Sequence, residues 1–364
     1  MKVLLVGNGG REHAIAWRLV QDESIQVTCV PGNGGTATLP RCQNLALTQD
    51  DFEGIAGFCT VNNVAFVVVG PEIPLAAGIT DFLQRKNIKV FGPQKAGAQI
   101  EASKAWAKDL MQSANIPTAK SAVFTDLPSA RAYAETEGAP IVIKADGLAA
   151  GKGVTVAMTV NEAIAALEGC FSGLFGAAGE QVVIEECLIG EEVSVLAITD
   201  GETIVPLLPA QDHKRIGEGD TGENTGGMGV YAPAPIATPE IMAQVQAQVL
   251  EPAIAELKRR GIQYCGILYA GLMISPTGKI NVIEFNCRFG DPETQVILPL
   301  LETPLHEIML ACIEGRLSTF GPLEWNPEVC ACVVAASGGY PGAYKKGLAI
   351  TGIAEAEAQA SLVF

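Results

Sequence analysis

The sequence predicts an α/β protein, and three observations support this fold class. Continuous apolar runs at residues 3–6 and 64–69 are typical of parallel strands that are covered on both faces. Each run is followed by a glycine-containing turn, at residues 7–10 and 70–72, and the first turn leads into a helical pattern. Apolar residues make up 48% of the 364 residues, which suffices for the cores of about two to three domains.

Composition and charge exclude several classes of protein. The 24 Lys and Arg residues against 40 Asp and Glu residues give a net charge of −16, which disfavours wrapping a nucleic-acid backbone but leaves room for local anion pockets. No apolar run reaches the roughly 18 residues of a membrane span, and the N-terminal run is too short for a signal peptide. The ten cysteines include no Cys-x-x-Cys pair and no Cys/His cluster, so we expect reduced thiols and a cytoplasmic protein.

The N-terminal part of the chain is predicted to be a Rossmann-like, doubly wound domain. Four apolar runs predict its strands, at residues 3–6, 25–30, 64–69 and 88–91. The turn at residues 7–12 joins a strand to a helix, a geometry in which backbone N–H groups can face an anion. Glu12 stands where a dinucleotide fingerprint has its third glycine, and Pro31 rather than an acid follows the second strand. An NAD site is therefore disfavoured, while a plain tight turn remains an alternative.

A glycine-rich segment between two strands predicts a hairpin that can cover phosphates. The strands are residues 141–144 and 154–158, and backbone N–H groups of the loop at 145–153 can act as donors. This is not a Walker loop, because the spacing from Gly147 to Gly151 is one residue short and a strand follows instead of a helix. A mobile hairpin tip without a ligand remains the alternative.

Two further pairs of predicted strands carry polar residues of interest. Strands at 181–186 and 193–198 flank an acidic turn, which suits an adenine edge and a ribose diol, although a solvated turn is equally compatible. The second pair is predicted at 271–274 and 279–286, and in the latter strand the two-residue period places Glu284 and Asn286 on one face. Two oxygen ligands on one face suit Mg²⁺, which also takes waters and substrate phosphates.

Together these segments resemble the ATP-grasp superfamily and, more closely, its phosphoribosylamine–glycine ligase family. The most specific segment is Arg-Phe-Gly-Asp-Pro-Glu-Thr-Gln at residues 288–295, which is similar to the signature of that family. Five other segments resemble the family pattern in the same order along the chain, at residues 7–13, 144–153, 211–215, 224–229 and 338–342. The resemblance therefore covers nearly the whole chain.

The resemblance implies both an architecture and a reaction. It implies a Rossmann-like domain at residues 1–101, an ATP-grasp domain at 102–316 with a hairpin-loop lid at about 118–190, and a partial C-terminal α+β domain at 317–364. The implied reaction uses ATP to join glycine to 5-phosphoribosylamine through glycyl phosphate, as a step of purine biosynthesis. Mg²⁺ or Mn²⁺ is the implied metal, and we expect a monomer without nucleic-acid or membrane partners.

The resemblance also implies site residues. Those for ATP are Lys104, Lys144, Gly147, Gly151, Lys152, Gly153, Glu185, Glu186, Leu188 and Glu192. The implied metal ligands are Glu284 and Asn286. Arg288 is the candidate for stabilising the transferring phosphoryl group, and Asp212 and Asp291 are the candidates for facing the glycine ammonium. Weaker candidates for substrate contacts are Gly9, Lys214 and Glu293.

Two departures from the family pattern keep alternatives open. Many ATP-grasp enzymes carry a further metal-binding carboxylate on the preceding strand, but residues 269–274 contain none. The family usually continues for some tens of residues beyond the position of Phe364, so we expect an exposed sheet edge here. The alternatives are another ATP-grasp ligase, such as a carboxylase or a peptide-bond ligase, and a form that binds ATP without turnover.

Overall fold

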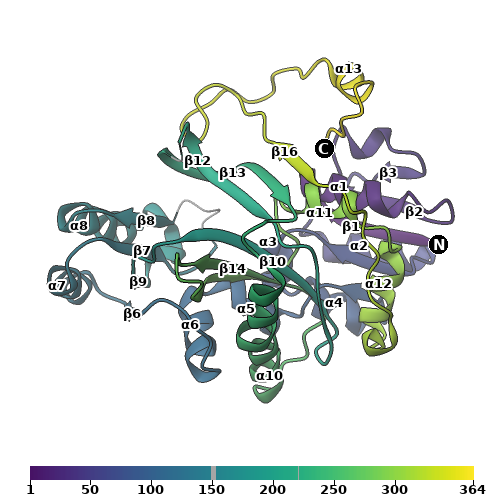
Figure 1. The fold of residues 1–364 in the computed structure, drawn as a ribbon. Coiled ribbons are helices and arrows are strands. Elements are labelled where there is room, and N and C mark those ends of the chain that lie inside the picture. The colour runs from purple at the N-terminus through teal and green to yellow at the C-terminus, as the bar shows by residue number, and fades with distance from the viewer. Residues whose placement is uncertain (149–152, 220) are drawn as a thin grey trace.

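A five-stranded parallel sheet forms the N-terminal part of the computed structural model, which describes residues 1–148, 153–219 and 221–364 (Figure 1). The strand order is β3-β2-β1-β4-β5. The strands are β1 (Lys2–Gly7), β2 (Gln26–Pro31), β3 (Cys42–Asn44), β4 (Phe66–Val69) and β5 (Val90–Phe91). The helices around them are α1 (Gly10–Leu19), α2 (Phe52–Asn62), α3 (Glu72–Ala77), α4 (Ile79–Arg85) and α5 (Lys95–Ala102). The four predicted strands are confirmed, and the doubly wound arrangement with them.

Alternate residues of β1 enter two different hydrophobic cores. Leu4 and Val6 belong to one core, while Val3 and Leu5 belong to the other, and all four are buried. This burial on both faces explains why the strand reads as a continuous apolar run. The short strand β3 was not predicted, because its residues Cys-Gln-Asn have no strand pattern and are ordered by pairing with β2.

The predicted lid is a four-stranded antiparallel sheet in the order β6-β9-β7-β8. Its strands are β6 (Ser121–Phe124), β7 (Ile141–Ala145), β8 (Val154–Ala157) and β9 (Val182–Glu186). The hairpin of β7 and β8 pairs Ile141 with Ala157 and Lys144 with Val154, as the sequence indicates. Helices α7 (Leu127–Glu137) and α8 (Val160–Gly169) pack on this sheet around a separate core, and the helical turns at Cys170–Leu174 and Gly176–Gly179 follow.

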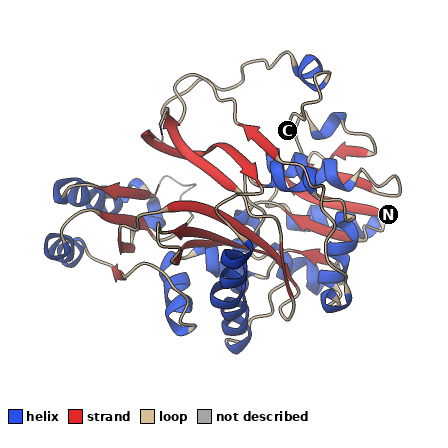
Figure 2. Cartoon of the chain, in the orientation of Figure 1, coloured by secondary structure: helices blue, strands red, loops and turns tan. Residues whose placement is uncertain are grey.

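The central sheet has the order β11-β10-β14-β15 and is antiparallel. Its strands are β10 (Glu191–Thr199), β11 (Ile204–Pro206), β14 (Gly266–Ile274) and β15 (Ile280–Asn286). Strand β14 is longer than the predicted 271–274, because the apolar residues from 266 onward continue the pairing with β10. The helices near this sheet are α6 (Lys104–Ser113), α9 (Pro239–Val245) and α10 (Glu251–Arg259). In Figure 2, the two longer ones, α6 and α10, lie below the central sheet.

A third, three-stranded sheet combines the middle of the chain with its C-terminal segment. Its strands are β12 (Gln211–Gly217), β13 (Thr221–Ala232) and β16 (Cys330–Val333), in that order. The polar, glycine-rich sequence of β13 shows no strand pattern, so pairing on both sides orders it. The remaining helices are α11 (Thr294–Leu300), α12 (Leu305–Ile313) and α13 (Ile353–Glu357), with short 3₁₀ turns at Thr36–Thr38 and Leu317–Thr319.

Across the described residues, none of the helices combines the length and apolar character that a membrane crossing requires. All ten cysteines are free thiols, which agrees with the expectation of a protein without disulfides.

Candidate active site

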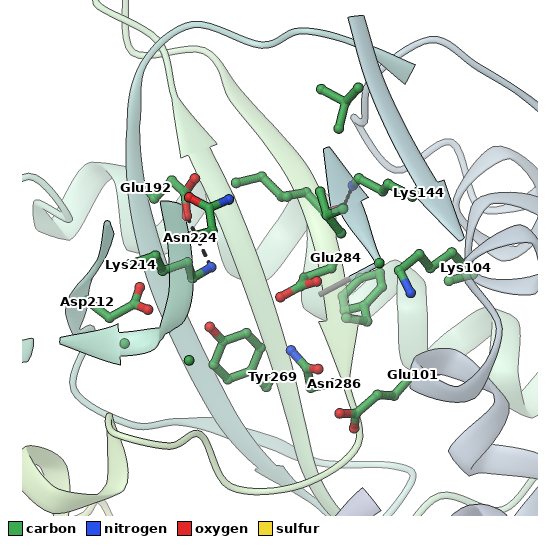
Figure 3. A pocket seen from close by; sticks show the side chains of 18 of the residues that line it. Glu101, Lys104, Lys144, Glu192, Asp212, Lys214, Asn224, Tyr269, Glu284 and Asn286 are labelled. Carbon is green, nitrogen blue, oxygen red and sulfur yellow. Dashed lines mark hydrogen bonds and ion pairs between the residues drawn. The ribbon is translucent and has the colours of Figure 1, made fainter. Parts of the chain in front are cut away.

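A cleft with a volume of about 670 Å³ lies where the N-terminal domain, the lid and the central sheet meet. Its walls come from α3, α5 and α6, from the strands β7, β9, β14 and β15, and from the β12–β13 hairpin. In the close view of Figure 3, Glu284 lies near the middle, with Lys104 and Lys144 on one side and Asp212 and Lys214 on the other. Segments that are far apart in the sequence therefore present charged groups to one space.

Most of the sequence-predicted site residues line this cleft. They are Lys104, Lys144, Gly147, Gly153, Glu185, Glu186, Leu188, Glu192, Asp212, Lys214, Glu284, Asn286, Arg288, Asp291 and Glu293. Gly9 is not part of the cleft wall, and Gly151 and Lys152 lie outside the described residues.

Three buried side chains, Lys108, Lys144 and Glu185, form what we call the lysine cluster. The Glu185 carboxylate lies 3.2 Å from Lys108 Nζ and 3.0 Å from Lys144 Nζ, and Lys144 also donates to the carbonyl oxygen of Ile283 at 3.1 Å. Burial lowers the pKa of Lys108 to about 8, although Glu185 opposes the shift. With two cations for one carboxylate, the cluster carries surplus positive charge into the cleft.

The start of the hairpin loop is tied to the start of α6. The Asp146 carboxylate accepts hydrogen bonds from the Ser103 hydroxyl at 3.0 Å and from the Ala105 N–H at 3.1 Å. Such an acceptor at a helix N-terminus satisfies donors that the helix itself leaves free. Lys104, the first residue of α6, donates to the carbonyl oxygen of Gly147 at 2.9 Å. The loop therefore begins at a defined position beside two lysines.

Apolar side chains form the part of the cleft between the lid and the central sheet. They are Ile100, Met111, Val142, Val154, Val156, Leu188, Met273 and Ile283. A flat apolar ring fits such a lining better than a charged group does. At the edge of this region, Glu192 pairs with Lys214 at 3.1 Å, and both side chains are partly exposed.

Glu284 and Asn286 lie on β15 and both line the cleft, as the two-residue period predicts (Figure 3). Burial by itself raises the pKa of Glu284, but the nearby cations Lys214, Lys144 and Lys104 outweigh it and the pKa lies below its usual value. An ionised carboxylate and an amide oxygen fit a hard divalent cation. The described residues hold no cluster of three His, Cys, Asp or Glu side chains with metal-ligand geometry, so waters and phosphate oxygens would complete the coordination.

Arg288, Glu101 and Glu72 form a second group, which we call the arginine cluster. Arg288 Nη2 lies 2.8 Å from a Glu101 oxygen, and Arg288 Nε lies 3.4 Å from a Glu72 oxygen. The guanidinium also donates to the carbonyl oxygen of Phe289 at 3.2 Å and to Asn286 Oδ1 at 3.4 Å. Arg288 is therefore held on several sides rather than free in the cleft.

The acidic candidates for substrate contacts have different surroundings. Burial raises the pKa of Asp212 to about 7, against the opposing charge of Lys214. Glu293 accepts hydrogen bonds from the hydroxyls of Ser194 at 2.8 Å and Tyr269 at 2.9 Å, which ties the segment after β15 to β10 and β14. Asp291 accepts from the Gln295 amide at 2.7 Å.

The N-terminal glycine turn is filled by its own helix. The Gly9 N–H donates to a Glu12 carboxylate oxygen at 2.7 Å. A Cβ at Gly7 would lie 2.3 Å from the Glu12 side chain, and one at Gly70 would lie 2.1 Å from it, so both positions require glycine. The crevice at the carboxyl ends of β1 and β4 thus holds a carboxylate where a dinucleotide-binding domain holds a phosphate.

Several cleft residues were missed by sequence reasoning. They are Arg11, Glu72, Glu101, Lys108, Asn224, Tyr269 and Tyr340. Lys108 could have been found, because it lies four residues after Lys104 and hence on the same face of one helix. Glu72 and Glu101 carry no local signal, since surface helices commonly contain such residues.

Comparisons with known proteins place the sequence in a family. The family model for the phosphoribosylglycinamide synthetase N domain matches residues 1–101, and that for the synthetase ATP-grasp (A) domain matches residues 102–294. A phosphoribosylamine–glycine ligase from Nostoc sp. (strain PCC 7120) is 68% identical over 100% of this chain and 86% of its own length. The corresponding protein from Synechocystis sp. (strain PCC 6803) is 58% identical with the same coverage.

Solved structures give the same result at the level of the fold. The crystal structure of phosphoribosylamine–glycine ligase from Thermotoga maritima superposes with a TM-score of 0.81 and 33% identity, covering 95% of this chain and 83% of that one. The biotin carboxylase domain of the Hydrogenobacter thermophilus 2-oxoglutarate carboxylase has a TM-score of 0.70 at 17% identity, covers 90% of this chain and 73% of that one, and shares the fold alone.

Proposed function

The chain belongs to the phosphoribosylamine–glycine ligase family, and on this premise we propose which residues of its cleft carry out the reaction. The protein is an ATP-dependent carbon–nitrogen ligase of purine biosynthesis. It joins glycine to 5-phosphoribosylamine and yields glycinamide ribonucleotide, ADP and phosphate. The observation that supports our assignment of roles is the convergence of buried lysines, Glu284, Asn286 and Arg288 on one cleft.

We assign the ATP subsite to the lid side of the cleft. Lys104 and Lys144 would be cationic partners for the α- and β-phosphates. The glycine-rich loop at 146–153, whose Gly151 and Lys152 lie outside the described residues, would provide donors for the β- and γ-phosphates. The segment from Glu185 through Glu186 to Leu188 would contact adenine next to the apolar lining, and Glu192 would receive the ribose hydroxyls. The surplus charge of the lysine cluster supports this assignment, because a triphosphate needs cations in a buried site.

We assign Mg²⁺ or Mn²⁺ to Glu284 and Asn286. The lowered pKa of Glu284, despite its burial, supports a carboxylate that is ionised and ready to bind a cation. Glu284 and Asn286 would hold such an ion beside the phosphates, and it would supply positive charge that offsets the charge developing on the transferring group. Strand β14 carries no further carboxylate, so Glu284 and Asn286 are the proposed side-chain ligands.

The remaining charged residues would act on glycine and on the acyl phosphate. A glycine carboxylate oxygen attacks the γ-phosphorus of ATP, and ADP leaves. The amine of phosphoribosylamine then attacks the acyl carbon, loses a proton, and displaces phosphate. Arg288 would stabilise the charge on the transferring group, and Asp212 or Asp291 would hold the glycine ammonium. Lys214, Glu293 and Gly9 are weaker candidates for contacts with glycine or phosphoribosylamine.

A coupled synthesis assay on this 364-residue chain tests the proposal. We expect ADP formation to require both glycine and phosphoribosylamine, with glycinamide ribonucleotide formed in equal amount. ADP formation that depends on bicarbonate would instead indicate a carboxylase, the activity of several proteins that share the fold. ATP binding without any substrate-dependent turnover would support the binding-only alternative. We propose that the monomer is the active unit.

A further inference from the structure

We propose that Glu101 is a positioning residue for the ligase reaction, because its carboxylate clamps the Arg288 guanidinium to the backbone that follows Asn286. Nothing in the sequence pattern identifies Glu101, and it needs no direct contact with a substrate to act in this way. The inference rests on the roles proposed above for Arg288 and Asn286.

Both oxygens of Glu101 are used, and each contacts a different part of the same segment. One oxygen lies 2.8 Å from Arg288 Nη2, and the other accepts the N–H of Cys287 at 2.8 Å. The Glu101 side chain is 7% exposed, so water competes little for either contact. One carboxylate therefore fixes the main chain at residue 287 and the side chain at residue 288 relative to each other.

The clamp lies directly beside the groups that would do the chemistry. Cys287 follows Asn286, the proposed metal ligand, and Arg288 Nη2 also donates to Asn286 Oδ1 at 3.4 Å. Movement of the Cys287 N–H would move the Asn286 side chain. Rotation of the Arg288 side chain would break its hydrogen bond to Asn286 Oδ1. Residues that hydrogen-bond to a metal ligand or to a charged group of a site, without contacting the substrate, commonly determine how well that group is oriented.

Glu101 also joins two regions of the chain at the cleft. It lies at the end of α5, three residues before Lys104, which begins α6 and contacts the hairpin loop. The segment from Glu101 to Lys104 therefore contacts the hairpin loop through Lys104 and Arg288 through Glu101. Glu72, the second carboxylate on Arg288, lies farther away at 3.4 Å and is more exposed, so it is the weaker partner.

The central experiment is the Glu101→Gln variant, measured by steady-state kinetics with each substrate varied in turn. A glutamine has one acceptor and one donor group, so it can accept from Arg288 or from the Cys287 N–H but not from both. We expect kcat to fall about 10- to 100-fold, the range seen when residues that hydrogen-bond to the ligands of a site are changed. The KM for ATP should change less than about twofold, because Lys104 and Lys144 are untouched.

The matched control is Glu256→Gln, which also removes a buried carboxylate that bridges two cationic contacts. Glu256 pairs with Arg259 at 2.6 Å and with Arg260 at 2.7 Å on α10, and it does not line the cleft. We expect this variant to lower Tm about as much as Glu101→Gln does while kcat stays at the wild-type value. If kcat of Glu101→Gln falls no more than that of the control, Glu101 has only a structural role and the proposal is overturned.

A double-mutant cycle with Arg288→Lys separates this inference from the proposed function. If Glu101 acts through Arg288, the double variant loses little more kcat than Arg288→Lys alone. Additive losses would show that Glu101 acts independently and would overturn the clamp. If Arg288→Lys itself retains wild-type kcat, the proposed role of Arg288 fails, and the clamp fails with it for a distinguishable reason.

Discussion

The lysine cluster is buried, the side chains of the arginine cluster are 7–23% exposed, and both clusters line the same cleft, but their charges are balanced in opposite ways. Lys108 and Lys144 share the single carboxylate of Glu185. In the arginine cluster, Glu72 and Glu101 share the single guanidinium of Arg288. The first group therefore has one cation in surplus, while the second has one carboxylate in surplus.

This difference indicates two different functions for buried charge. A surplus lysine can attract a polyanion, so the lysine cluster suits the phosphates of ATP. The arginine cluster attracts no anion by net charge, and its contribution is to hold the Arg288 guanidinium in one orientation in the cleft. Burial raises the pKa of Glu101 and lowers that of Lys108, so in each cluster burial favours the neutral form of one group.

The largest effect is expected at Glu284, whose pKa is lowered first by Lys214 and then by Lys144, Lys104 and Arg288 against the opposing effect of burial. Glu284→Ala removes the only carboxylate on this strand that faces the proposed metal position, so metal-dependent turnover should fall to background while the fold is retained. ADP release measured against Mg²⁺ and Mn²⁺ concentration, with circular dichroism of the same samples, tests this. Retained metal-dependent activity would refute the metal assignment.

A large effect on one substrate is expected when the lysine cluster is broken. Lys144→Met should weaken ATP binding about 10- to 100-fold, the equivalent of roughly 1.5–3 kcal/mol for a charge-assisted hydrogen bond. Glycine binding should change much less. Isothermal titration with each ligand measures the two effects separately. The control is Lys120→Met, since Lys120 is exposed and pairs with Glu137 outside the cleft; equal losses of ATP affinity in both variants would contradict the comparison.

A smaller, pH-dependent effect should come from Lys108. Its pKa of about 8 means that the folded protein loses the surplus charge of the lysine cluster above that pH, so ATP affinity should fall by a few-fold between about pH 8 and 9. Lys108→Arg stays charged and should remove this dependence. If both proteins show the same pH profile, Lys108 does not set the charge of the cluster.

The lowered pKa of Lys108 also predicts how the free energy of unfolding changes with pH. Between about pH 8 and the ordinary lysine pKa of about 10.4, the unfolded chain holds a proton on Lys108 that the folded chain has released. The free energy of unfolding of the wild type should therefore rise with pH in this window relative to Lys108→Arg. Urea denaturation at several pH values measures the difference.

The smallest effect is expected at an exposed ion pair that is as short as the buried ones. Lys258 and Glu202 approach to 2.6 Å, but both side chains are mostly exposed. Lys258→Ala should change the free energy of unfolding by less than about 1 kcal/mol and leave kcat unchanged. Urea denaturation checks this, and a larger loss would show that the length of an ion pair, and not its burial, sets its contribution to stability.

Much of the fold could be predicted because it follows from local periodicity. The apolar runs of β1 and β4 identify buried parallel strands, and the hairpin of β7 and β8 follows from two strands around a glycine-rich loop. Strands β12 and β13 could not be predicted from pattern, because their polar residues become strands only by pairing with each other and with β16. The turn after β1 could be identified as a glycine turn, but not that Glu12 fills it.

The sequence by itself determined the order of the motifs, the shared face of Glu284 and Asn286, and the identity of the lysines near the hairpin, since each depends on residues close together in the chain. Only the tertiary structure decided which buried charges meet. The Glu101 carboxylate accepts a hydrogen bond from the Cys287 N–H, 186 residues away in the chain. The Glu185 carboxylate on β9 pairs with Lys108 on α6. The physical reason is that an ion pair depends on burial and distance, and both are set by how separate elements pack rather than by local sequence.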